Sequence, residues 1–301
     1  MNKPVFSTPK VWWVGVLAFG LTLLTSGIWL ALIVGNLKTT PTIPWSIAVM
    51  AALLWIIWQY CDGKWSPEST AGIRHHLMRA KSVPKKILVW AFLAGIFSIV
   101  ALMGFWIILS SLVKFPRNVT LNSSSYPWYV SFLVVVMASV SGSITEEIGF
   151  RGYFQKTLEM KGRGRAAIFI IALSILPAHA LTQGFKWPVL VFYLLVDIML
   201  GAIAYLTDSI LPGVVVHAVG LLAFFVLVWP YDSTRRLVLA SGPDVRFWVH
   251  GGQMIFFAIA ACWAFKRLAN VDGRKIGHYC GDNQYDLEKP ETDGTFSNIR
   301  R

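Results

Sequence analysis

The chain has 301 residues, of which 55% are hydrophobic and 14% are charged, and its mean hydropathy is +0.58. This composition argues against an ordinary soluble protein and indicates a membrane protein. The net charge of +12 is expected to face anionic lipid. No Arg-rich nucleic-acid motif accompanies it, so nucleic acid is not an expected partner.

Apolar runs of membrane-spanning length recur along the chain. A helix needs about 20 apolar residues to cross a bilayer. Eight runs reach or approach that length: 11–35, 43–60, 87–113, 127–149, 166–183, 187–207, 210–230 and 247–268. The sequence therefore predicts an all-α polytopic membrane protein with about eight transmembrane helices in a lipid bilayer. The first run is expected to be a retained helix, because residues 1–10 are too polar and too short for a signal peptide.

Lys and Arg residues concentrate in the loop 61–86, in the loop 150–165 and in the tail that starts at Lys266. Because positive residues favour the cytoplasmic side, this pattern predicts an even number of spans with both termini in the cytoplasm, as in a multi-pass protein of the cell (inner) membrane. The three cysteines, Cys61, Cys262 and Cys280, have no CxxC spacing. Their spacing argues against a zinc ribbon or a redox pair.

Two adjacent carboxylates, Glu146 and Glu147, fall at the end of the apolar run 127–149. A charged group inside a bilayer costs roughly 2.5 to 3.5 kcal/mol on insertion scales, so it needs a partner. Arg151 follows Glu147 by four residues, which predicts an ion pair on one helix face and leaves Glu146 free to face the interior. Spacing alone leaves a second reading open, in which both glutamates lie at a solvated cytoplasmic helix end.

Two histidines fall within apolar runs: His179, two residues after Pro177, and His217, near the start of the seventh run. A Pro inside a membrane helix frees a backbone carbonyl and marks a kink. By residue counting, His217 and Glu146 lie at similar depth, and His179 lies deeper unless the helix kinks. Asp197 is a further deep acid. It is expected either to form a helix-to-helix hydrogen bond or to support one of the histidines.

These residues resemble the motifs of the CAAX-processing and bacteriocin-processing (CPBP) intramembrane proteases, over roughly residues 128–230. Glu146, Glu147 and Arg151 match the first motif, E-E-x-x-x-R. His179 matches the histidine of the second motif, F-x-x-x-H, although Ile175 replaces its Phe. The third block is represented by Gly201, Tyr205, Thr207, Ser209 and His217, with Leu221 at the position where the family normally has Asn or Asp.

The resemblance implies hydrolysis of a peptide or protein substrate at the membrane, by an activated water in a cavity open to the cytoplasm. Glu146 would be the general base, helped by His179 in orienting the water. His217 would stabilise the oxyanion of the tetrahedral intermediate. Glu147 and Arg151 would hold the helix in place, and Arg151 could also bind a substrate carboxylate.

Leu221 leaves alternatives open, because it cannot donate the hydrogen bond that the family's Asn is thought to give. Loss of one oxyanion donor typically costs about 10²- to 10³-fold in rate. The chain could be a slow protease, or a non-proteolytic membrane scaffold or immunity-type protein of the same fold. Glu146, His179 and His217 could also hold zinc. The metal-free version is preferred and no cofactor is expected, since the chain lacks H-E-x-x-H.

A transporter is disfavoured, since no inverted pair of Gly- or Pro-broken segments is found. Four regions are predicted. Residues 1–126 hold the N-terminal transmembrane helices and a basic loop, and residues 127–230 form the CPBP-like catalytic core. Residues 231–272 contain the last transmembrane helix, and residues 273–301 form a polar cytoplasmic tail. The substrate and the oligomeric state are not specified by the sequence.

Overall fold

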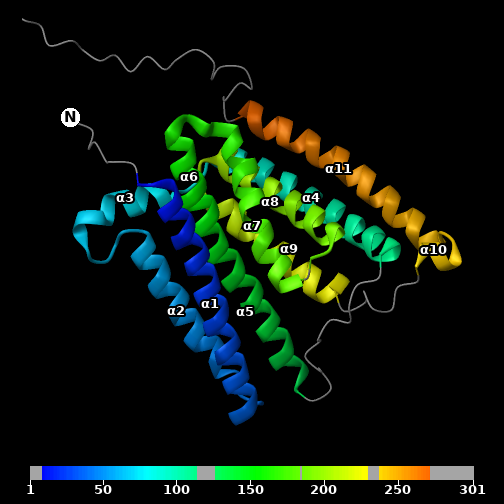
Figure 1. Cartoon of the computed structure of the whole chain (residues 1–301), viewed down its shortest axis with the longest axis horizontal. Coiled ribbons are helices and arrows are strands. Elements are labelled where there is room, and N and C mark those ends of the chain that lie inside the picture. Colours follow the sequence, from blue (N-terminus) through cyan, green and yellow to red (C-terminus); the bar gives the residue numbers. More distant parts are fainter. Residues whose placement is uncertain (1–8, 114–125, 184, 230–236, 272–301) are drawn as a thin grey trace, which may run out of the picture.

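The computed structural model describes residues 9–113, 126–183, 185–229 and 237–271 (Figure 1), and these contain helices and no β-strand. The α-helices are α1 (Val11–Thr39), α2 (Trp45–Cys61), α3 (Glu68–Met78), α4 (Lys85–Leu112), α5 (Trp128–Glu146), α6 (Gln155–Leu158), α7 (Gly164–Gln183), α8 (Trp187–Thr207), α9 (Leu211–Ala223), α10 (Val238–Ser241) and α11 (Val245–Val271). The π-helical segments are η2 (Glu147–Phe154), η3 (Glu159–Arg163) and η4 (Phe224–Val228). The all-α prediction is confirmed. The predicted tail 273–301, with Cys280, lies outside the described residues.

Six helical stretches in the described part of the chain are long and apolar enough to cross a membrane: Val11–Thr39, Lys85–Leu112, Trp128–Ala180, Trp187–Thr207, Leu211–Val228 and Val245–Val271. The third stretch contains both α5 and α7, separated by a turn where Lys161 and Gly162 leave the helical conformation. A shorter apolar helix, α2, has 17 residues. Each predicted apolar run is therefore helical, and the number of eight spans stays a prediction.

The outer surface of the bundle is strongly apolar. Large side chains such as Trp128, Phe256 and Ile259 expose 78%, 66% and 66% of their surface. A soluble monomer rarely exposes this much apolar surface, whereas a surface that faces lipid is expected to be apolar. In lipid, the helical backbone satisfies its own hydrogen bonds. The chain is a multi-pass membrane protein.

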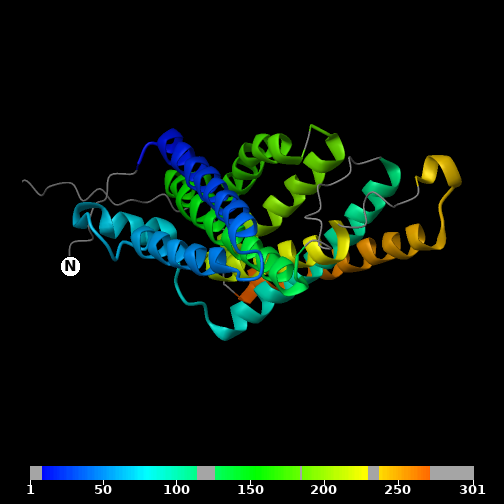
Figure 2. The same cartoon turned by 90° about the horizontal axis from the view of Figure 1, so that it is seen from below.

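The helices are arranged so that the carboxylates and the histidines can meet. Helix α5 packs against α9, and α7 packs against α8. Helix α11 runs along α4 at one edge of the bundle, while α1, α2 and α5 lie side by side at the other (Figure 1). Viewed from below, α10 lies at the extremity opposite α1 to α3 (Figure 2). The helices that carry the candidate residues therefore lie between these two edges.

The helical run that starts at Trp128 does not end at residue 149, as the sequence predicted. It continues through η2 and α6 into η3, up to the turn at Lys161 and Gly162, so Glu146 and Glu147 lie within a long helical run rather than at its end. The change to a π-helix occurs at Glu147. Hydrogen bonds in a π-helix run from i to i+5, and such segments are rare and often occur at functional sites.

The first helix packs closely against this π-helical segment. A Cβ added to Gly149 would lie 3.2 Å from the Cα of Ala18. Small residues of this kind let membrane helices approach each other closely. The rings of Phe19 and Phe150 meet edge-to-face, with their centroids 5.0 Å apart. Helix α1 thereby fixes the segment that carries the carboxylates.

The basic loop 61–86 contains helix α3, which the search for apolar runs did not predict. Arg74 of α3 is buried and its guanidinium donates hydrogen bonds to the carbonyls of Tyr60, Trp65 and Pro67. These bonds fold the loop back on itself. Because α3 also packs on η2, this loop is part of the scaffold around the candidate site.

Candidate functional site

A cavity of about 320 Å³ lies within the bundle, between α1, α4, α5, α7, α8, α9 and η4. Most of its wall is apolar. Its polar lining residues are Ser26, Glu146, His179, Tyr193, Asp197 and His217. The fold therefore brings Glu146, His179 and His217, which the sequence predicted as a catalytic set, to one cavity, although they come from three different helices.

Glu146 is the carboxylate that faces this cavity. Its side chain keeps 20% of its surface exposed, and its Oε2 lies 3.9 Å from Nε2 of His217. This distance is too long for a hydrogen bond, but a water molecule or a substrate group can enter between them. Glu146 is thus the acid with access to a reactant.

Glu147 points away from the cavity and is fully buried, with 0% of its side chain exposed. Its Oε1 lies 3.1 Å from Nδ1 of His217 and 3.4 Å from Nη1 of Arg151. Space for its Oε2 depends on Gly213, where a Cβ would come within 2.7 Å of that oxygen. The predicted ion pair with Arg151 is present, and the alternative of a solvated helix end is wrong.

Arg151 is also fully buried, and it bridges two acids from different helices. Besides Glu147, its Nη2 contacts Oδ1 of Asp197 on α8. The side chain of Arg151 does not line the cavity. Binding of a substrate carboxylate by Arg151 stays a prediction, and in this arrangement its guanidinium is buried away from the cavity.

Asp197 joins this buried arginine to His179. Its Oδ2 lies 3.5 Å from Nε2 of His179, so the two expectations for Asp197, a helix-to-helix contact and support of a histidine, both hold. The ring of His179 stacks on Tyr193, with centroids 3.8 Å apart and an angle of 8°. The sequence interpretation missed Tyr193. Its spacing of four residues from Asp197, which places both on one face of α8, is the signal that could have found it.

The two ring nitrogens of His217 face different acids. Nδ1 lies beside buried Glu147 and Nε2 points toward Glu146 and the cavity. Glu147 thus holds the ring at Nδ1, and Nε2 is the nitrogen that faces Glu146 and the cavity.

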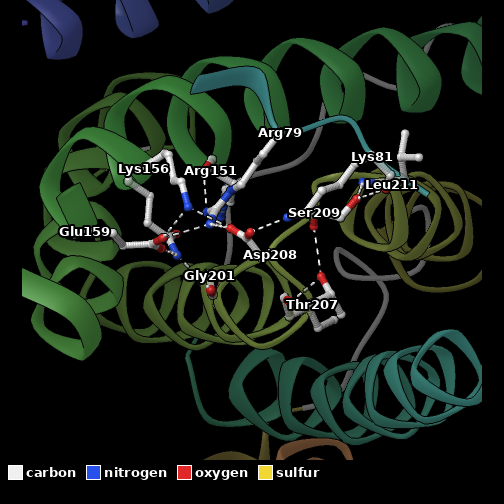
Figure 3. A network of polar contacts seen from close by, with 12 residues as sticks. Arg79, Lys81, Arg151, Lys156, Glu159, Gly201, Thr207, Asp208, Ser209 and Leu211 are labelled. Carbon is white, nitrogen blue, oxygen red and sulfur yellow. Dashed lines mark hydrogen bonds and ion pairs between the residues drawn. The ribbon is translucent and has the colours of Figure 1, made fainter. Parts of the chain in front are cut away.

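A second polar cluster, the helix-end network, consists of Arg79, Lys81, Lys156, Glu159 and Asp208 (Figure 3). Arg79 Nη1 donates to Glu159 Oε2 at 2.9 Å and Lys156 Nζ donates to Asp208 Oδ1 at 2.8 Å. Lys81 also donates to Asp208. Burial by itself would raise the pKa of Asp208, but the hydrogen bonds from Lys156 and Lys81 outweigh it and lower the pKa below its ordinary value.

The helix-end network is connected to the site through Arg79, whose Nη2 donates to the carbonyl of Arg151 at 2.6 Å. His217 of the third sequence block lines the cavity, whereas Gly201 and Ser209 of the same block lie beside this network (Figure 3). The carbonyl of Gly201 accepts from Gln155 at 3.0 Å, and Ser209 Oγ donates to the carbonyl of Lys81 at 2.7 Å. These two hydrogen bonds join segments that are far apart in the chain.

The three residues considered as zinc ligands were Glu146, His179 and His217. Across the described residues, no group of three His, Cys, Asp or Glu side chains is arranged to hold a metal ion. His179 instead faces Asp197, and one nitrogen of His217 faces Glu147. The side chains as arranged do not fit a three-ligand zinc site.

Comparison with known proteins finds one matching family model, in the central region of the chain. Residues 127–222 match the family described as Type II CAAX prenyl endopeptidase Rce1-like. This region includes all three motif blocks, and the match confirms the resemblance to the CAAX-type intramembrane proteases of the CPBP family. No curated protein and no solved structure matches the chain.

Proposed function

We propose that this CAAX-type membrane protein is a working endopeptidase, which hydrolyses a peptide bond near the membrane surface with a water activated by Glu146. The observation that carries the proposal is the asymmetry of the two glutamates. Glu146 lines the cavity, whereas Glu147 is buried behind it and held by Arg151 and His217. One acid is available for chemistry, and the other positions the site.

In the proposed reaction Glu146 takes a proton from water, and the hydroxide formed attacks the carbonyl carbon of the scissile peptide bond. The tetrahedral intermediate then expels the amine, which receives the proton from Glu146, leaving an acid and an amine as products. His179, fixed by Asp197 and Tyr193, orients the water.

The remaining polar residues position these groups. Arg151 lies between the buried carboxylates of Glu147 and Asp197, and without it neither would face a guanidinium. Glu147 fixes the ring of His217 so that Nε2 faces the cavity. We place the cavity entrance and both chain termini on the cytoplasmic side of the cell membrane, as the Lys and Arg distribution indicates.

Leu221 favours a second candidate function, a membrane scaffold or immunity-type protein that keeps the fold without turnover. Leu221 lines the cavity and offers it no hydrogen-bond donor. The other departure, Ile175, carries less weight. Ile175 is buried in a core cluster with Val14 and Phe154 and does not line the cavity, so its replacement of Phe affects packing rather than chemistry.

The proposal is tested by comparing membrane-associated peptides from cells that express the wild type with those from cells that express Glu146→Gln at the same level. A fragment present with the wild type and absent with the variant is the expected result. Ser139→Ala, whose hydroxyl bonds the carbonyl of Val135 on the same helix, is a control that should cleave like the wild type.

Identical peptides from the wild type and Glu146→Gln would overturn the protease proposal and favour the scaffold.

The zinc version is tested on the purified protein. Stoichiometric zinc, with activity that a chelator removes and zinc restores, would contradict the metal-free reaction. Unchanged cleavage in the chelator is the expected result.

A further inference from the structure

Four basic side chains lie at the ends of α4 and α11, outside the candidate site. Lys85 and Lys86 begin α4, and Lys266 and Arg267 lie near the end of α11. All four are exposed. Neither helix contains an Asp or a Glu, and within the described part of the chain none of the four forms an ion pair with an acid. The described residues therefore leave this positive charge without a counter-charge.

Two ring contacts fix the alignment of α4 with α11. The rings of Trp90 and Trp263 meet edge-to-face, with their centroids 5.1 Å apart, and those of Phe97 and Phe257 have centroids 6.0 Å apart. The second contact lies later in α4 and earlier in α11, so the two helices are antiparallel. The start of α4 and the end of α11 therefore lie at the same end of the helix pair.

Lys86 and Arg267 each lie one helical turn beyond the tryptophan contact. Lys86 precedes Trp90 by four residues, and Arg267 follows Trp263 by four. Residues four apart share one helix face, so the two basic residues extend the faces on which the tryptophan rings meet. The guanidinium of Arg267 also lies 5.6 Å from the ring centroid of Trp263, within cation–π range. A single anionic group can therefore contact basic side chains from both helices.

An exposed apolar stripe leads away from the basic residues along α11. Arg267, Trp263 and Ile259 are spaced by four residues, so they lie on one face. Phe256 continues this face three residues earlier. Trp263, Ile259 and Phe256 expose 48%, 66% and 66% of their surface. The order along the face is thus a cation, an indole ring of the kind found at membrane interfaces, and apolar side chains. A ligand with an anionic head and apolar chains matches this order, whereas a phosphate ion would leave the stripe uncovered.

We propose that this end of the α4–α11 pair binds one anionic phospholipid, whose phosphate contacts Lys86 and Arg267 and whose acyl chains lie along α11. Lys85 and Lys266 add to the positive potential. Basic sites between membrane helices on the cytoplasmic side bind anionic headgroups, and we place this end on that side by the same Lys and Arg distribution as the cavity entrance. The site lies outside the matched region 127–222 and does not depend on the proposed protease function.

The test is native mass spectrometry of the purified full-length protein, titrated with phosphatidylglycerol or with phosphatidylcholine that has the same acyl chains. The wild type should retain one phosphatidylglycerol with about 30-fold higher affinity than phosphatidylcholine, the effect of two basic residues near an anionic headgroup. Lys86→Gln/Arg267→Gln should abolish this preference. Lys38→Gln/Arg246→Gln, which removes two exposed charges at other helix ends, is the matched control and should keep it.

Two further measurements identify the occupant. A large molar excess of inorganic phosphate should not displace the bound phosphatidylglycerol, because phosphate does not cover the apolar stripe. Displacement would indicate a site for free phosphate and overturn the lipid proposal. Phosphatidylglycerol with a photoactivatable acyl chain should crosslink to residues 256–267 of the wild type, which tests the site even if the double variant does not fold. Equal affinity for the two lipids, an equal loss of preference in the control, or crosslinks confined to other helices would also overturn it.

Discussion

The molecule has two polar regions, the candidate site and the helix-end network, and they differ in how deeply their charged side chains are buried. In the site, Glu147 and Arg151 are completely buried and Asp197 nearly so. In the helix-end network Arg79 is buried, but its partners keep solvent contact: the side chains of Glu159, Asp208 and Lys81 are 11%, 23% and 56% exposed. Exposed pairs are worth about 0 to 1 kcal/mol each, whereas a buried charge is costly unless it is paired. The site therefore tolerates no missing partner, while the network does.

The backbone conformation also differs between the two regions. In the network, Arg79 and Asp208 both adopt a left-handed conformation, with φ of 45° and 46°, and their side chains lie 3.6 Å apart. In the site the backbone stays helical, and room for Glu147 comes from the missing side chain of Gly213. The helix-end network therefore lies at turns between helices, whereas the site depends on close packing of one helix against another.

The largest predicted effect is on stability when Arg151 is replaced. Arg151→Met leaves Glu147 and Asp197 without their shared cation, so we expect the free energy of unfolding to fall by about 3 to 5 kcal/mol. Lys81→Met is the matched change in the helix-end network and should cost less than about 1 kcal/mol. Denaturant unfolding in mixed micelles measures both. Equal losses for the two variants would contradict the difference in burial between the regions.

A second prediction concerns the space around Glu147. Gly213→Ala places a methyl group within 2.7 Å of Oε2, which displaces the carboxylate and the ring of His217. Overpacking of this kind costs about 1 to 3 kcal/mol, and cleavage should fall with it. Gly251→Ala, where no atom lies within 4 Å, is the control. Its unfolding midpoint should stay the same or rise, because Ala favours the helix by about 1 kcal/mol.

The smallest predicted effect is the pH dependence of the network. The pKa of Asp208 is lowered in the folded state, so its contribution is fully present above its unfolded pKa of about 3.9 and is lost as the pH falls toward the folded value. Asp208→Asn should be less stable than the wild type at pH 7, and the gap should shrink below about pH 4. Unfolding midpoints measured across this range would show a constant gap if Lys156 and Lys81 did not hold the carboxylate.

Much of the fold was predictable from hydrophobic runs, because each membrane helix must carry about 20 apolar residues wherever it lies. The same logic missed α3, whose polar sequence gives no apolar run and whose position is set by Arg74 and its three carbonyl partners. It also ended the helix of Glu146 at residue 149, since the residues that follow, such as Arg151 and Lys156, are charged and interrupt the apolar run although the helix continues.

For the site, the sequence by itself determined that Glu146, Glu147, Arg151, His179 and His217 belong together, because their spacing matches the family motifs. It also determined the Glu147–Arg151 pair, which follows from local helix geometry. The tertiary structure decided the rest. Which glutamate faces the cavity, which acid lies beside His179, and the contribution of α1 to the cavity wall all depend on contacts between helices far apart in the chain. These contacts have no period or spacing in the sequence.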